Sequence, residues 1–161
     1  MKYGNKTRYA HSYIGLGLTP QIGQELTKRK LTPSIEVWVV ATKLFRITPV
    51  KITHNGSTRL YDHLVISNIP KMSKFITVAP GASVTDGLLE ITTVKSGSFL
   101  RLLRHLLRRV VAEDAEPKQI SEFVFTCVRP AILQLDGEVV QLKQGQRVRV
   151  VCAPKLLRTI V

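Results

Sequence analysis

Alternation of apolar and polar residues with a period of two dominates the chain beyond residue 50 and predicts a mainly β protein. Val50–His54 and Arg59–Ile66 flank Asn55-Gly56. Asn-Gly readily adopts the positive φ angles of a type I′ turn, so this stretch predicts a β-hairpin. Many short strands separated by turn residues favour an antiparallel β-sandwich or barrel. The other expected strands are Tyr9–Leu18, Phe75–Val78, Leu88–Val94, Ile120–Val128, Ala131–Leu135, Val139–Leu142, Gln146–Cys152 and Leu156–Val161.

Helical patterns make the expected fold class α+β, with a few helices added to a mainly β protein. Thr19-Pro20 predicts a helix from Pro20 to Lys30, with Thr19 as the N-cap and Pro20 as the first helical residue. Thr32-Pro33 predicts the start of a second helix, which is apolar on nearly all sides and therefore buried or partly strand.

A third helix is expected over Phe99–Val111, with Ser98 as its N-cap. One side of this helix is apolar and the other is basic. The basic side is either a solvated face or a surface for anionic lipid head groups. Its candidate lipid contacts are Arg101, Arg104 and Arg108.

Length and composition indicate one domain over residues 1–161. The chain is 44% hydrophobic, which excludes a disordered protein, and it has no run of about 20 apolar residues, which excludes a membrane-spanning helix. Twenty-four Lys and Arg against eleven Asp and Glu give a net charge of +13. This charge favours anionic partners such as phosphate groups, nucleic acid or an acidic membrane surface. Aromatic residues amount to only 6% and do not interleave with the basic clusters, which argues against nucleic acid.

The cysteines and histidines do not predict a metal site. Cys127 and Cys152 lie in apolar, β-like segments without a second Cys or a His at zinc-ligand spacing. We interpret them as reduced core thiols of an intracellular protein, either cytoplasmic or peripheral to a membrane. Structural or surface roles are expected for the scattered histidines, His11, His54, His63 and His105.

Two Asp-Gly pairs are the candidate chemical sites. Asp86-Gly87 and Asp136-Gly137 each predict a turn, and each carboxylate could also bind a hard cation such as Mg²⁺. In an extended strand, Asp136 and Glu138 would project to the same face. Such a pair suits a base beside a metal–water network, or only a solvated strand edge.

The order of several motifs resembles the C-terminal half of the diacylglycerol-kinase-type catalytic module. Bacterial diacylglycerol-kinase-like lipid kinases, sphingoid long-chain-base kinases and ceramide kinases share this module. The pairing of P-x-A-x-x-x-D-G-L-L with D-G-E about fifty residues later is the most specific element. The matching segments are Ser12–Gly17, Val65–Asn68, Ala79–Ala82, Thr85–Ile91, Leu135–Glu138 and Ala153-Pro154.

The resemblance implies a β-sandwich that carries the lipid-acceptor cleft, beside a separate domain that binds ATP through a G-G-D-G-T loop. It implies that Asp136 is the general base and that Glu138 joins a carboxylate–water–Mg²⁺ network. It also implies a structural Mg²⁺ held by Asp86 and by backbone carbonyls near Ser83 and Leu88.

No G-G-D-G-T segment occurs in these 161 residues. We therefore expect the lipid-acceptor half of an ATP-dependent lipid kinase, of diacylglycerol or sphingoid-base type. This half would be inactive without a nucleotide-binding domain supplied in cis or in trans. The basic, polar start of the chain suggests a fragment of a larger protein.

Three alternatives remain open from the sequence. A degenerate domain could be a non-catalytic module that binds anionic lipid or a partner protein. A nucleic-acid binder is motivated by the net charge alone. An NAD-kinase-like protein would share the two-domain plan, although the D-G-L-L-E-I and D-G-E pair fits the lipid kinases better.

Overall fold

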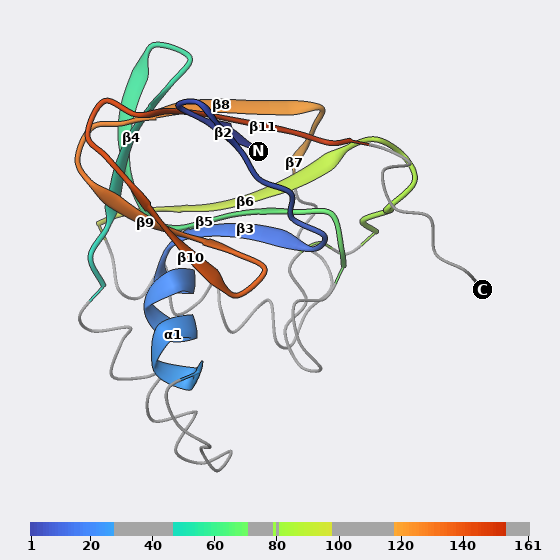
Figure 1. The fold of residues 1–161 in the computed structure, drawn as a ribbon, viewed down its shortest axis with the longest axis horizontal. Helices are drawn as coiled ribbons and strands as arrows, with labels where there is room; N and C mark the ends of the chain where they lie inside the picture. Colours follow the sequence, from blue (N-terminus) through green and yellow to red (C-terminus); the bar gives the residue numbers. More distant parts are fainter. Residues whose placement is uncertain (28–46, 71–78, 80, 98–117, 154–161) are drawn as a thin grey trace.

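The computed structural model describes residues 1–27, 47–70, 79, 81–97 and 118–153. Eleven strands and one helix occur in these ranges (Figure 1). In chain order they are β1 (Lys2–Tyr3), β2 (Lys6–Thr7), β3 (Tyr13–Gly17), α1 (Leu18–Thr27), β4 (Val50–His54), β5 (Ser57–Ser67), β6 (Leu89–Lys95), β7 (Lys118–Ile120), β8 (Glu122–Cys127), β9 (Ala131–Leu135), β10 (Glu138–Leu142) and β11 (Arg147–Val151).

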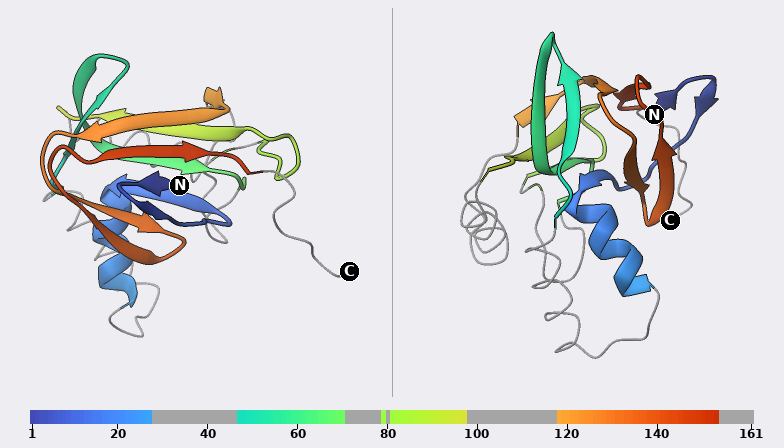
Figure 2. Two further views of the ribbon diagram at one scale, coloured as in Figure 1. Left: turned by 45° about the horizontal axis from the view of Figure 1, so that its top comes forward. Right: turned by 90° about the vertical axis from the view of Figure 1, so that its left-hand side faces the viewer.

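All eleven strands belong to one antiparallel sheet that curls over on itself. Its main path runs β10-β9-β3-β5-β4-β8-β11-β1-β2, and β6 and β7 extend it from β5. Strands β8 and β11 lie over β3, β5 and β6, and β4 joins these two layers because it pairs with both β5 and β8 (Figures 1 and 2). The expected mainly β antiparallel fold is confirmed, and the two layers are parts of one continuous sheet.

The hydrophobic core fills the space between the two layers. In β8 and β11 the buried residues alternate with exposed or half-buried ones, as in a sheet with one wet face. In β3, β5 and β6 consecutive residues are buried, so this layer is covered on both faces. Helix α1 lies against the outer face of β3, β5 and β9. The buried hydrophobic residues without exposed surface are Leu16, Ile52, Leu64, Ala79, Phe125, Leu133 and Val148.

Two hairpins have the predicted turn chemistry. Asn55 and Gly56 have φ angles of 47° and 73°, and Asp136 and Gly137 have φ angles of 48° and 95°. Positive φ at both central residues defines the type I′ turn, whose twist matches that of the flanking strands. Strands β4 and β9 therefore occur where the sequence predicts them.

The junction between β3 and α1 depends on close packing at two glycines. A Cβ on Gly15 would lie 2.6 Å from Thr19 Cβ, and a Cβ on Gly17 would lie 2.4 Å from the Asp62 carbonyl oxygen. Gly17 also has a φ of +76°, so β3 ends there and α1 begins at once. The predicted helix start at Pro20 is wrong by two residues, because Leu18 directly follows this reversal.

Other sequence predictions were only partly right. The single strand expected over Ile120–Val128 is divided at Ser121, because β7 pairs with β6 and β8 pairs with β4 and β11. The polar start of the chain contains β1 and β2, which were not predicted. The expected strands Phe75–Val78 and Leu156–Val161, the helix from Thr32-Pro33 and the helix Phe99–Val111 lie outside the described residues.

We predict that Gly17→Ala destabilises the fold by at least about 3 kcal/mol. A left-handed backbone costs a non-glycine residue roughly 1–2 kcal/mol, and the overlap with Asp62 adds to that cost. Gly56→Ala is the matched control, because Gly56 has a similar φ and no atom within 4 Å of an added Cβ. Urea unfolding of the three proteins measures the difference. Equal losses for the two variants would contradict the packing argument.

Candidate functional site

The Asp136 side chain is held by the backbone at the start of β3. Asp136 Oδ1 accepts hydrogen bonds from the N–H groups of Ser12 at 3.0 Å and Tyr13 at 2.9 Å. Asp136 Oδ2 accepts one from His11 N–H. The Asp136 N–H in turn donates to the Tyr13 carbonyl oxygen at 3.2 Å. The carboxylate is therefore fixed in one orientation by a cradle of three N–H donors, residues 11–13.

Among the described residues, this cradle leaves Asp136 one free acceptor position. A carboxylate offers about four lone-pair sites, and the three N–H groups occupy three of them. Hydrogen bonds to an ionised oxygen are about twice as strong as neutral ones, so the cradle also stabilises the chain locally. Sequence reasoning found Asp136 but not its partners, since they lie more than 120 residues away.

Glu138 does not act as a partner of Asp136 on one strand face. Asp136 lies in the turn with a φ of +48°, so the extended geometry that would align the two carboxylates is absent. Glu138 Oε2 instead accepts a hydrogen bond from Arg8 Nη1 at 2.9 Å. Both side chains are at least half exposed, and ion pairs of this kind contribute little stability.

A row of polar residues crosses the outer face of the sheet beside Asp136. Tyr13 pairs with Ser67, Ser67 with Glu90, and Glu90 with Gln119. Residues directly opposite in antiparallel strands project to the same face, so these four side chains share it. Ser67 and Glu90 are only 2% and 1% exposed. A charged residue inside the apolar segment Leu88–Val94 was the signal that could have predicted this row.

Glu90 is the most unusual titratable group in the row. Glu90 Oε1 accepts a weak 3.5 Å hydrogen bond from Gln119, and Oε2 has no hydrogen-bond partner within the described part of the chain. Burial raises the pKa of the Glu90 carboxyl, and the negative charge of Asp86 raises it further. Burial and the charge of Asp136 likewise raise the pKa of the Tyr13 phenol, so Tyr13 stays a neutral hydrogen-bond donor.

Cys127, His54 and His63 have structural contacts or burial as expected, whereas His105 lies outside the described residues. Cys127 and Cys152 are both free thiols, and burial raises the pKa of Cys127 to about 11. Cys127 lies in the core, whereas Cys152 is only half-buried. His54 Nδ1 lies 2.7 Å from the Val124 carbonyl oxygen, and its ring stacks on Phe123 at 4.3 Å. His63 Nδ1 lies 3.4 Å from Thr19 Oγ1.

The Asp86 segment is a surface turn stabilised by its own side chains. Asp86 Oδ1 accepts a hydrogen bond from Leu88 N–H at 2.9 Å, and Ser83 Oγ lies 3.0 Å from Thr85 Oγ1. Asp86 Oδ2 and nearby carbonyl oxygens are hard donors of the kind that Mg²⁺ prefers. Over residues 1–27, 47–70, 79, 81–97 and 118–153, no three His, Cys, Asp or Glu side chains gather as a metal cluster. A cation here would therefore depend on backbone carbonyls and water as well as Asp86.

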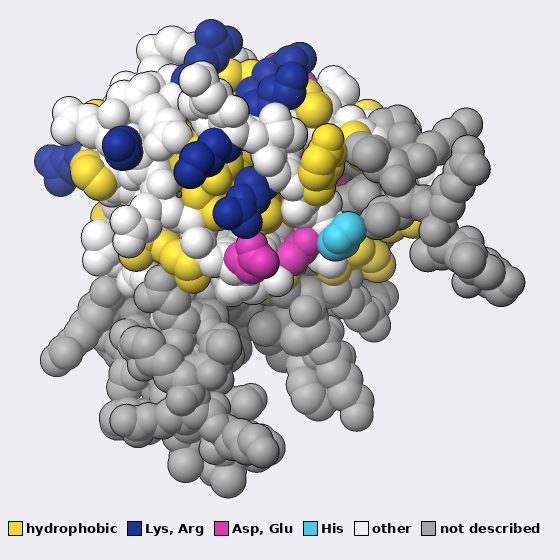
Figure 3. All heavy atoms as spheres, in the orientation of Figure 1, with side chains coloured by type: hydrophobic (Ala, Val, Ile, Leu, Met, Phe, Trp, Pro, Cys, Tyr) yellow, Lys and Arg dark blue, Asp and Glu magenta, His cyan; other side chains and the backbone are white. Residues whose placement is uncertain are grey.

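Basic side chains are spread over the face of the molecule that carries β8 and β11, and acidic side chains lie beside a histidine below them (Figure 3). The candidate lipid contacts Arg101, Arg104 and Arg108 lie outside the described residues. No helix in the described ranges is long and apolar enough to cross a membrane.

Comparison with known proteins identifies the fold. One crystal structure of a "putative diacylglycerol kinase" from Bacillus anthracis str. Sterne matches with a TM-score of 0.51 and 14% identity, covering 91% of this chain and 53% of that one. A second structure with the same description and organism matches with a TM-score of 0.52 and 21% identity, covering 87% and 50%. The chain thus spans about half the length of the solved structures it matches. No family model matches the sequence, and no curated protein does. The resemblance predicted from the sequence is confirmed for the fold.

We predict that Glu90→Gln stabilises the protein at neutral pH by an amount of the order of 1 kcal/mol, by removing a buried charge with an unpartnered oxygen. The pKa of the Glu90 carboxyl is higher in the folded protein than its ordinary value of 4.5. Protonated Glu90 therefore contributes its full stability below pH 4.5, and this contribution is lost as the pH rises through the pKa of the folded state. The variant should therefore match the wild type at pH 4 and exceed it at pH 7, as measured by urea unfolding.

Glu122→Gln is the control for this pH series. The hydrogen bond from Arg149 lowers the pKa of the Glu122 carboxyl. Ionised Glu122 therefore stabilises the fold above pH 4.5, which is the opposite pH dependence to that of Glu90. A Glu90→Gln variant that is less stable than the wild type at pH 7 would show that the ionised carboxylate supports the fold.

Proposed function

We propose that this chain is the lipid-acceptor half of an ATP-dependent lipid kinase, acting on the hydroxyl group of a diacylglycerol or a sphingoid base. The Asp136 cradle is the observation that carries the proposal. It supports this function because a fixed carboxylate with one free acceptor position suits a general base. The fold shared with diacylglycerol-kinase-like structures supports it further.

In this proposal the oxygen of the lipid hydroxyl attacks the γ-phosphate of ATP, and Asp136 accepts the hydroxyl proton. The bond between the γ-phosphorus and the β–γ bridging oxygen breaks, and ADP leaves. The cradle holds the carboxylate still, so the hydroxyl meets a base of fixed direction. Burial and the charge of Asp136 raise the pKa of the Tyr13 phenol, so Tyr13 stays protonated and would donate a hydrogen bond to the same polar head group. Glu138 lies at the exposed edge of the site and takes part through water.

Mg²⁺ and ATP are the cofactors of the proposed reaction. Mg²⁺ would offset phosphate charge in the transferring group, and a structural Mg²⁺ would be held by Asp86 with backbone carbonyls near Ser83 and Leu88. Since the sequence has no G-G-D-G-T loop, the ATP phosphates would be bound by a nucleotide-binding domain in cis or in trans. Arg101, Arg104 and Arg108 would bring the domain to an anionic membrane surface.

One observation favours a second function, a non-catalytic module that binds anionic lipid or a partner protein. The three N–H groups of the cradle give Asp136 a sufficient structural role, because it joins the β9–β10 turn to the start of β3. A degenerate domain would retain Asp136 for this reason alone. The two functions differ in what happens when the base is lost but the fold is kept.

We predict that Asp136→Asn lowers kcat of the product of the complete gene at least about a hundredfold, since general bases contribute 10²–10⁴-fold. The measurement is phosphate transfer from ATP to diacylglycerol or sphingosine in mixed micelles. The variant should also lose about 1–3 kcal/mol of stability, because its amide donor meets a backbone donor of the cradle. The assay is therefore run where urea unfolding shows the variant to be fully folded. Normal turnover by that folded variant would contradict the assignment of the base.

We also predict that Mg²⁺ stabilises the chain through Asp86. A ligand at ten times its Kd adds about 1.4 kcal/mol to the free energy of unfolding. Asp86→Asn should lose this gain, and Glu122→Gln, which removes an acidic charge elsewhere, should keep it. Thermal unfolding with and without Mg²⁺ measures both variants. An equal gain in the wild type and in Asp86→Asn would exclude the site.

A further inference from the structure

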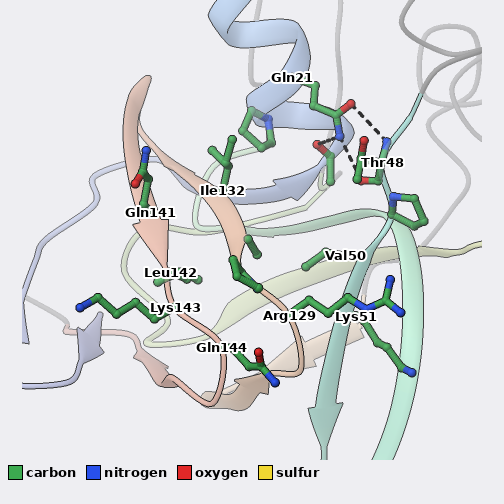
Figure 4. A pocket seen from close by; sticks show the side chains of 15 residues that line it. Gln21, Thr48, Val50, Lys51, Arg129, Ile132, Gln141, Leu142, Lys143 and Gln144 are labelled. Atoms are coloured by element: carbon green, nitrogen blue, oxygen red, sulfur yellow. Dashed lines mark hydrogen bonds between the residues drawn. The ribbon is translucent and has the colours of Figure 1, made fainter.

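A pocket opens at the end of the curled sheet that is remote from Asp136. It has a volume of about 740 Å³ and lies between the start of α1, the start of β4 and the β9–β10 hairpin (Figure 4). Ile132 on β9 is four residues before Asp136, which corresponds to roughly 13 Å along an extended strand. The pocket therefore lies at the opposite end of β9 and is independent of the proposed kinase function.

The wall between α1 and β4 is preformed by one side chain. Gln21 Nε2 donates to the carbonyl oxygens of Gly17 and Thr48, both at 3.0 Å, and Gln21 Oε1 accepts from Thr48 N–H at 3.3 Å. These bonds engage both polar atoms of the Gln21 amide within the protein (Figure 4). The cavity thus has a fixed edge, as ligand pockets usually do.

The floor of the pocket is apolar and partly uncovered. Leu142 and Val50 belong to the hydrophobic core, so the floor continues into the interior of the sheet. Ile132 points from β9 toward α1 across the pocket, and it is 41% exposed (Figure 4). Covering such a surface is favourable for an aliphatic group.

The rim of the pocket is basic. Lys51, Arg129 and Lys143 line it, and no acidic residue does. Within the described residues these three side chains form no ion pair, since the pairs found there involve Arg8 and Arg149. The Lys51 and Arg129 side chains extend to the same side of the pocket, whereas Lys143 extends away on the other side (Figure 4). Two neighbouring cations beside a cavity whose described lining has no acidic residue are complementary to an anion.

We propose that this pocket binds a single-chain amphipathic anion, with its aliphatic chain against Ile132 and its head group, a phosphate or carboxylate, between Lys51 and Arg129. The apolar floor distinguishes this ligand from a free inorganic anion. The basic rim distinguishes it from a neutral lipid. No aromatic residue lines the pocket to stack a nucleobase.

Isothermal titration of the full chain with three probes tests the proposal. Dodecyl phosphate, below its micellar concentration, should bind with one-to-one stoichiometry. Inorganic phosphate, which lacks the chain, and dodecyl maltoside, which lacks the charge, should each bind at least about tenfold more weakly. Equal binding of dodecyl phosphate and either other probe would overturn the proposal, as would no binding of dodecyl phosphate.

Matched variants locate the binding. Lys51→Gln with Arg129→Gln should weaken dodecyl phosphate binding about tenfold. Lys118→Gln with Arg147→Gln, which removes the same charge from exposed positions outside the pocket, should not. Ile132→Asn should weaken it several-fold, and Val139→Asn, at a 44% exposed position on the same hairpin, should not. Thermal unfolding confirms that each variant is folded. Equal effects of the site and control variants would place the binding elsewhere and overturn the proposal.

Discussion

The contact between the Asp136 carboxylate and the N–H groups of residues 11–13 is the constraint on which the outer half of the structure depends. It fixes the β9–β10 turn to the start of β3, and β3 pairs with both β9 and β5 from that point. Gly17 ends the same strand five residues into it and starts α1. A short strand held at one end by a charge and at the other by a glycine thus sets the register of three strands and the position of the helix.

Much of the fold could be predicted from local signals. Asn55-Gly56 and Asp136-Gly137 favour the type I′ turn through their own backbone preferences, so β4 and β9 are predicted at their observed bounds. The division of Ile120–Val128 into β7 and β8 at Ser121 could not be predicted. It depends on tertiary pairing, because β7 joins β6 whereas β8 joins β4 and β11. The start of α1 was misplaced for a related reason: the Thr-Pro signal is local, whereas the close approach of Gly17 to Asp62 is tertiary.

The candidate site shows the same division between local and tertiary information. Asp136, Glu138 and Asp86 were found because Asp-Gly is a visible local motif. The cradle around Asp136 and the polar row containing Glu90 were not, since they arise only when β3, β5, β6 and β7 lie side by side. Both faces of this layer are buried, and burial is what raises the pKa values of Tyr13 and Glu90. On a solvent-exposed face, the same side chains would not undergo this shift.

The β9–β10 hairpin links the two proposed sites, which have opposite requirements. Its turn holds a carboxylate by backbone donors alone, while its open end adjoins three basic side chains and an apolar floor. Strand alternation permits this arrangement, because Leu133 and Leu135 fill the core while Ile132 and Gln134 face the other side. Since Ile132 is partly exposed and contributes little to the core, the pocket can change without disturbing the pairing that positions Asp136. A domain that had lost transfer chemistry at the turn could therefore still bind an anionic amphiphile at its other end, and the two properties need not have been retained together.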